Sequence, residues 1–143
     1  MTDTELLERF ENCTLPAEQF THRAHVKVAY LYLKQDSFEG ALNKIRSGIQ
    51  AYQRAQGVPD DPTMGYNETT THALMHLIGA IMAAYSEEIP TVDAEAFCDA
   101  HPQLMSKHVL RFFYSPERRM LPEAKRQFVE PDLTSLPTIL SNN

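Results

Sequence analysis

The chain has 143 residues, 43% of them hydrophobic and 22% charged, which is typical of one soluble globular domain. Its formal net charge of −6 argues against a nonspecific nucleic-acid binder. The acidic, amphipathic N-terminus does not resemble a signal peptide, so we expect a cytoplasmic protein. Cys13 and Cys98 form no C-x-x-C motif and indicate neither a disulfide framework nor a thiolate metal site.

The N-terminal part of the chain carries three helical patterns. Apolar residues at helical spacing predict a helix from about Asp3 to Asn12, a second over residues 22–35 and a third from about Phe38 to Ala55. A short helical turn that ends at Phe20 separates the first two. The predicted N-caps are Thr2 for the first helix and either Asp36 or Ser37 for the third, and the second helix begins at Thr21.

The loop Val58–Tyr66, rich in Pro and Asp, leads into the most distinctive stretch of the chain. Thr69–Ser86 contains no Asp, Glu, Lys or Arg, and a helix that is apolar on every side must be surrounded by other elements. His72, His76 and several hydroxyl groups make this stretch too polar for a membrane span. We therefore expect a central helix at about 69–86 and no membrane partner.

The C-terminal part alternates short helical patterns with prolines. We expect a short helix from about Asp93 to Ala100, another over Gln103–Tyr114, and further turns that begin at Pro116 and Pro122. An extended tail should follow over about 129–143. Together these patterns predict an all-α, single-domain irregular bundle of five to seven helices around the central helix. The predicted cap of the short helix is Asp93 or Thr91.

Charge is distributed unevenly along the chain. No Lys or Arg occurs between Arg54 and Lys107, whereas basic residues dominate from Lys107 to Arg126. The acidic and basic segments either pair with each other within one domain, or the basic segment is a docking surface. We favour mutual pairing, because segregation of charge along a chain is a weak sign of a partner.

Four side chains form a candidate metal site. His22 and His25 project from adjacent turns of one helix face, and Glu68 and His72 do the same on the central helix. Two such pairs on packed helices would supply ligands suited to Zn²⁺, Fe²⁺, Ni²⁺ or Mn²⁺. The H-x-x-x-H pair of His72 and His76 lacks the Glu of an H-E-x-x-H motif, so it does not indicate a zincin.

The same residues also have a purely structural interpretation. A histidine on an apolar face usually forms hydrogen bonds within the core, and for His22 and His25 this interpretation and the functional one are evenly balanced. Glu68 near a helix start can be explained by the helix dipole alone. The structural interpretation is favoured for His76, His101 and His108.

Three segments are specific in combination: Phe20–Val26 (FTHRAHV), Gly65–Thr71 (GYNETTT) and Phe128–Leu133 (FVEPDL). With them the chain resembles an uncharacterised family of small bacterial helical proteins, and the resemblance covers most of the chain. It implies a shortlist of functional positions. These are His22, His25, Tyr66, Glu68, Thr71, Tyr114 and Glu130-Pro131-Asp132.

The resulting hypothesis is a pocket where the start of helix 22–35 meets the start of the central helix. A divalent Zn, Fe, Ni or Mn ion would be held by His22, His25 and Glu68, with His72 as an optional ligand. Glu68 and Tyr66 would act in catalysis on a small molecule, and without a metal the same groups suit general acid/base chemistry. The substrate-binding candidates are Thr69, Thr71 and Tyr114.

The alternative is a non-enzymatic ligand-binding or assembly module with structural core histidines, for which self-association is open. Geometry separates the two hypotheses. Metal ligation requires the imidazole nitrogens of His22 and His25 and the carboxylate of Glu68 to converge within about 5 Å.

Overall fold

The computed structural model describes residues 1–139, and within them the chain forms helices and connecting loops but no strand. Seven α-helices and three short 3-10 helices follow one another, which confirms the all-α prediction and the predicted number of helices. Their bounds are α1 Asp3–Glu11, η1 Ala17–Gln19, α2 His22–Gln35, α3 Phe38–Ala55, α4 Glu68–Tyr85, α5 Ala94–Ala100, η2 Pro102–Leu104, η3 Val109–Phe112, α6 Pro116–Arg119 and α7 Pro122–Arg126.

Side-chain caps explain where the helices of the N-terminal half begin. The hydroxyl oxygens of Thr2, Thr21 and Ser37 each accept a hydrogen bond from the backbone N–H three residues later, at 3.1, 3.2 and 3.2 Å. The carboxylate of Asp93 caps α5 in the same way at 2.8 Å. Each cap of this kind stabilises a helix by about 1 kcal/mol. The predicted starts of α1, α2, α3 and α5 are therefore confirmed.

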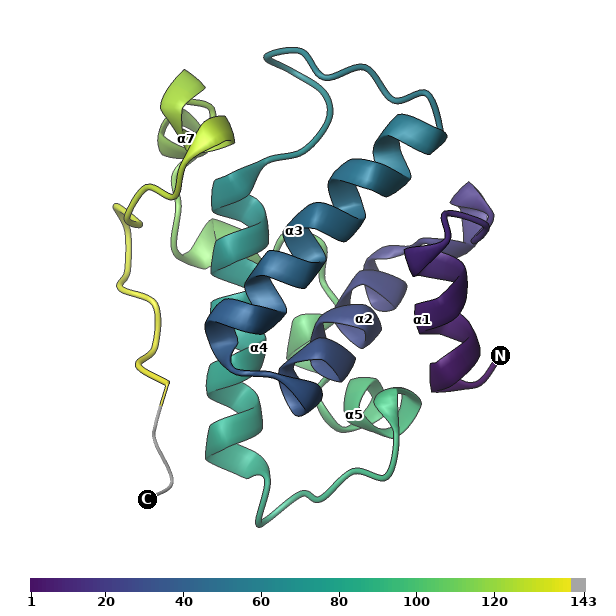
Figure 1. Cartoon of the computed structure of the whole chain (residues 1–143). Coiled ribbons are helices and arrows are strands. Elements are labelled where there is room, and N and C mark those ends of the chain that lie inside the picture. Colours follow the sequence, from purple (N-terminus) through teal and green to yellow (C-terminus); the bar gives the residue numbers. More distant parts are fainter. Residues whose placement is uncertain (140–143) are drawn as a thin grey trace.

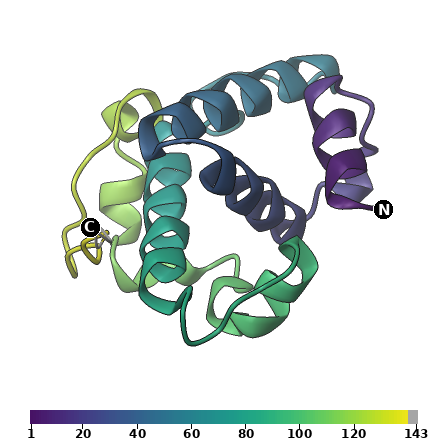
Figure 2. The same cartoon turned by 60° about the horizontal axis from the view of Figure 1, so that its bottom comes forward.

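The central helix α4 begins one residue earlier than predicted and ends one residue earlier. Asn67 Oδ1 accepts a hydrogen bond from the Thr70 N–H at 2.9 Å, which makes Glu68 the first helical residue. Helix α4 contacts α2, α3, η3 and α7. In both views it lies between α2 and the C-terminal segment (Figures 1 and 2). The segment with no charged side chain is therefore surrounded by other elements over most of its length, whereas Ala84, Tyr85 and Ser86 at its C-terminal end are exposed.

One face of α4 is occupied by the C-terminal segment. Thr69 donates a hydrogen bond to the carbonyl of Gln127 at 3.0 Å and accepts one from the N–H of Val129 at 3.2 Å. Seven residues further along the helix, His76 Nε2 donates to the carbonyl of Pro137 at 2.6 Å. Residues at this spacing share one side of a helix. We call Thr69, His72, His76 and Gly79 the tail face of α4.

Gly79 and His72 complete the tail face by close packing. A Cβ atom at Gly79 would lie 3.3 Å from the side chain of Ile139, so the glycine lets the tail approach the helix. The imidazole of His72 stacks on the ring of Phe128, with 4.1 Å between centroids. The tail has no helix over 129–139, as predicted, and residues 140–143 of the predicted tail lie outside the described residues.

The predicted helix over Gln103–Tyr114 is wrong. This segment forms two 3-10 turns, η2 and η3, separated by residues 105–108. Ser106 Oγ accepts a hydrogen bond from the His108 N–H at 3.2 Å, and local bonds of this type compete with helical backbone pairing. The two turns bury Leu104 and Leu110, which the spacing attributed to one helix, but leave Phe112 exposed. Across residues 1–139, no helix combines the length and the apolar character needed to cross a bilayer.

Candidate functional site

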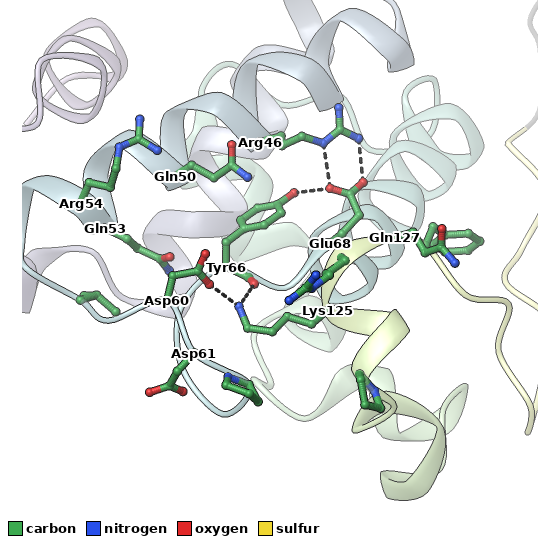
Figure 3. Close-up of a pocket in the computed structure, with 15 residues that line it drawn as sticks. Arg46, Gln50, Gln53, Arg54, Asp60, Asp61, Tyr66, Glu68, Lys125 and Gln127 are labelled. Atoms are coloured by element: carbon green, nitrogen blue, oxygen red, sulfur yellow. Dashed lines mark hydrogen bonds and ion pairs between the residues drawn. The ribbon is translucent and has the colours of Figure 1, made fainter.

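A cleft of about 790 Å³ lies between α3, the loop that follows it, the start of α4 and the segment around α7 (Figure 3). Helix α3 contributes a row of polar side chains, one helical turn apart, to one wall. The opposite wall comes from the residues around α7. The polar and charged residues that line the cleft are Arg46, Gln50, Gln53, Arg54, Asp60, Asp61, Tyr66, Glu68, Lys125, Arg126 and Gln127.

A buried carboxylate anchors one end of the cleft. Glu68 is 7% exposed, and Arg46 binds it through two parallel hydrogen bonds, Nε to Oε1 at 2.8 Å and Nη2 to Oε2 at 2.7 Å. The hydroxyl of Tyr66 donates to Oε1 at 2.7 Å (Figure 3). Arg46 is held in turn through Nη1, which donates to Asn43 Oδ1 at 2.7 Å. Charged, two-point bonds of this kind fix the guanidinium plane.

This network sets the protonation states of its members. Burial raises the pKa of Glu68, but the hydrogen bonds from Arg46 and Tyr66 lower it by more, so the group is ionised at neutral pH. Burial and the bond to Glu68 raise the pKa of Tyr66, which keeps its proton. With both oxygens accepting hydrogen bonds, Glu68 is suited to position Arg46 and Tyr66 rather than to take a proton. The predicted catalytic roles of Glu68 and Tyr66 stay predictions.

The loop before α4 places Tyr66 at the cleft. Gly65 has φ +91°, and a Cβ atom there would lie 2.9 Å from the carbonyl oxygen of Pro59, so this turn requires glycine. Lys125 of α7 then fastens the loop, because its Nζ donates to the carbonyl of Tyr66 at 2.8 Å and to Asp60 Oδ1 at 2.6 Å. The result is a tyrosine held at both its backbone and its hydroxyl.

Two arginines that line the cleft take no part in its ion pairs. Arg46 is paired with Glu68, and Lys125 with Asp60. Within residues 1–139, neither Arg54 of α3 nor Arg126 of α7 forms an ion pair. The cleft therefore offers two free guanidinium groups, on facing walls.

The predicted pairing between the acidic and basic segments is found at a single ion pair among the described residues, Lys125 with Asp60. Other acidic side chains pair with the N-terminal part of the chain instead. Arg23 of α2 lies 2.5 Å from Glu95 and 2.8 Å from Asp99. The acidic residues of α5 therefore pair with a helix that is close in space but distant in sequence.

A second, smaller cavity of about 180 Å³ lies between α2, α3 and α4. Here the structure brings together three of the predicted site residues, His25, Tyr66 and Thr71. Tyr66 lines both this cavity and the larger cleft, as does Gln53. Tyr66, just before α4, therefore contributes to the lining of both cavities.

The predicted metal ligands are not gathered into one group. Among residues 1–139, no cluster of three or more His, Cys, Asp or Glu side chains is placed to hold a metal ion. His22 Nε2 donates to the carbonyl of Leu104 at 2.7 Å, and His25 Nδ1 to that of Thr21 at 2.8 Å. His72 Nδ1 lies 4.0 Å from Glu68 Oε2, as its position one turn away requires. Metal binding stays a prediction, and these contacts do not support the four-ligand set.

Two predicted substrate-binding residues are used inside the fold. Thr69 holds the backbone at Gln127 and Val129, as described above, and the hydroxyl of Tyr114 donates to the carbonyl of Val129 at 2.7 Å. Burial raises the pKa of Tyr114 to about 12, so this donor is kept. Asp132 accepts two further bonds from Ser115, at 2.8 and 2.6 Å. Thr69, Tyr114 and Asp132 therefore fasten the tail, whereas Thr71 lines the smaller cavity.

Sequence reasoning missed the residues of α3 and α7 that line the cleft. One signal was available on α3, where Arg46, Gln50 and Gln53 follow at intervals of four and three residues. Such a polar stripe is common on any exposed helix face, so it does not single out a site. For Lys125 and Arg126 no local pattern pointed to the start of α4.

Comparison of the chain with models of protein families, with curated proteins and with solved structures found no match. The resemblance to small bacterial helical proteins therefore stays a prediction, and the functional proposal below is based on the geometry of the site.

Proposed function

We propose that this protein binds a small anionic molecule, bearing carboxylate or phosphate groups, in the cleft between α3 and α7. The observation that carries the proposal is the pair of guanidinium groups, Arg54 and Arg126, which line the same cleft and have no ion pair within the described residues. Guanidinium groups bind carboxylates and phosphates through two parallel hydrogen bonds, which makes arginine the preferred residue for such ligands.

The remainder of the cleft suits the polar body of such a ligand. The amide side chains of Gln50, Gln53 and Gln127 can each donate and accept hydrogen bonds. A volume of about 790 Å³ lies within the usual range of small-molecule sites. The bonds that hold Arg46 and Tyr66 to Glu68 support the proposal further, because a wall fixed before binding lowers the entropic cost of binding.

Calorimetric titration with inorganic phosphate and with citrate, at constant ionic strength, tests the proposal. We expect saturable binding of at least one anion, weakened about tenfold or more in Arg54→Gln and in Arg126→Gln, because each change removes a charged hydrogen-bond donor. Arg111→Gln is the matched control, since Arg111 is exposed and lies outside the cleft. Absence of binding at millimolar anion, or equal affinity in all three variants, would contradict the proposal.

A further inference from the structure

The smaller cavity has a composition different from that of the cleft. Aliphatic side chains from three helices, Ala29, Ile45, Ile49 and Leu74, form one part of its lining, beside the polar side chains of Gln53, Asn67, Thr70 and Thr71. Its volume of about 180 Å³ is close to that of an apolar cavity of about 150 Å³ that holds one benzene ring in another protein. The space is therefore large enough for a single ring.

One polar group of this lining has an unused lone pair. His25 Nδ1 lies 2.8 Å from the carbonyl oxygen of Thr21, and because a carbonyl only accepts, Nδ1 carries the proton. In the neutral ring Nε2 is then a hydrogen-bond acceptor. Within residues 1–139 Nε2 has no hydrogen-bond partner, and it is not among the side-chain atoms sealed from solvent without one. A molecule in the cavity can therefore compete with water for this nitrogen.

The ring of His25 is also fixed in place. It stacks on Phe20, with 3.7 Å between centroids and 16° between planes, and the Thr21 carbonyl holds its other edge. Burial lowers the pKa of His25 below its ordinary 6.5, so the acceptor form dominates at neutral pH. An acceptor with a fixed direction loses little entropy when it bonds to a ligand.

We infer that this cavity is a second binding site, for a neutral single-ring molecule that carries one hydrogen-bond donor, such as a phenol, with the donor on His25 Nε2. The aliphatic side chains pack against the ring, and the imidazole selects for the donor. The inference does not depend on anion binding in the cleft, because neither Arg54 nor Arg126 lines this cavity.

Titration with phenol and, separately, with toluene, followed by two-dimensional NMR of the backbone amides, tests the inference. We expect saturable shifts concentrated at residues 65–71, with phenol bound about threefold to tenfold more tightly than toluene, which is the effect of one net hydrogen bond. In His25→Phe, which keeps an aromatic ring against Phe20 but removes the acceptor, the two affinities should become equal.

Two cavity-filling variants, Ala29→Leu and Leu74→Trp, should abolish the binding of both probes, and the second serves if the first does not fold. The double change Arg54→Gln and Arg126→Gln should leave phenol binding unchanged, so failure of the anion proposal is distinguishable from failure here. The inference is overturned if neither probe gives saturable shifts, if His25→Phe keeps the preference for phenol, or if folded filled variants bind phenol as well as the natural chain.

Discussion

The tail face of α4 and the N-terminal edge of the same helix use polar side chains in opposite ways. On the tail face, the hydroxyl of Thr69 and the ring of His76 are bonded to backbone groups of the C-terminal segment. At the edge, Glu68 accepts hydrogen bonds from both Arg46 and Tyr66, and Tyr66 lines two cavities. Polar residues in an apolar helix therefore divide into those that fasten the chain and those that shape a site.

This contrast shows that most histidines of the chain are weaker functional candidates than the sequence suggested. A histidine attracts functional hypotheses wherever it stands, yet His22, His72 and His76 each have a structural partner here: a carbonyl, an aromatic ring and a carbonyl. His25 also bonds a carbonyl, that of Thr21, but of these four histidines it alone lines one of the two cavities described above. Neighbouring positions on one helix thus have different roles, which only the packing distinguishes.

The largest effect is expected from breaking the network at the edge. Arg46→Ala leaves the carboxylate of Glu68 buried without its main partner, and we expect the free energy of unfolding to fall by about 3 kcal/mol. Urea denaturation measures this. Asp99→Ala is the control, because Asp99 is 70% exposed in its ion pair with Arg23 and such a pair is worth less than about 1 kcal/mol. Equal losses in both variants would show that the edge network contributes no more than a surface pair.

A somewhat smaller effect on the free energy of unfolding should distinguish Thr69 from Thr71. Thr69→Val keeps the shape of the side chain but removes both bonds to the tail, leaving a buried N–H and a carbonyl without a partner, so unfolding should become easier by about 2 kcal/mol. Thr71→Val should cost less than about 0.5 kcal/mol. Thermal or urea denaturation of the two variants is a direct comparison, since both changes have the same effect on helix propensity. A larger loss for Thr71→Val would reverse the assignment of the two residues.

Acid should weaken the edge network. The folded pKa of Glu68 lies below its ordinary 4.5, so its contribution to stability is fully present above about pH 4.5 and is lost as the pH falls through the folded value. The difference in unfolding free energy between the natural chain and Glu68→Gln should be constant from pH 7 to about 5 and shrink below that. Denaturation curves at a series of pH values measure it. A difference that stays constant down to pH 3 would mean that the carboxylate is not held by its charge.

The smallest effect is expected from metal ions. Both carboxylate oxygens of Glu68 accept hydrogen bonds from Arg46 or Tyr66, so we expect substoichiometric metal in protein that has been purified anaerobically and reconstituted with Zn²⁺, Fe²⁺, Ni²⁺ or Mn²⁺. Element-resolved analysis of the metal content is the measurement. One equivalent of metal that is lost in both His25→Ala and Glu68→Ala would restore the four-ligand hypothesis.

Local signals made most of the fold predictable. Caps such as Thr21 and Ser37 lie within three residues of the groups they bind, so the sequence contains both partners of each bond. The wrong helix prediction over Gln103–Tyr114 also has a local cause. Ser106 accepts a hydrogen bond from a backbone N–H two residues away, and this bond competes with helical pairing.

The site was predictable only in part, because its partners are distant in sequence. The spacing brought attention to Glu68, but Arg46, which binds it, lies 22 residues earlier, and Gln127, which Thr69 binds, lies 58 residues later. A buried carboxylate requires a cation, and that requirement predicts a partner without identifying it. The tail contacts of Thr69 and Tyr114 could not be inferred from patterns that describe one helix at a time.

The division between a fastened tail face and a binding edge is tested most directly by mapping anion binding onto backbone amides with NMR, using phosphate and citrate at constant ionic strength. We predict saturable shifts at residues 50–54 of α3 and 125–127 beside α7, with the amides of 129–137 along the tail face unchanged. Shifts confined to the tail segment, or spread evenly over the exposed basic residues of the chain, would contradict the assignment of the cleft as the binding site.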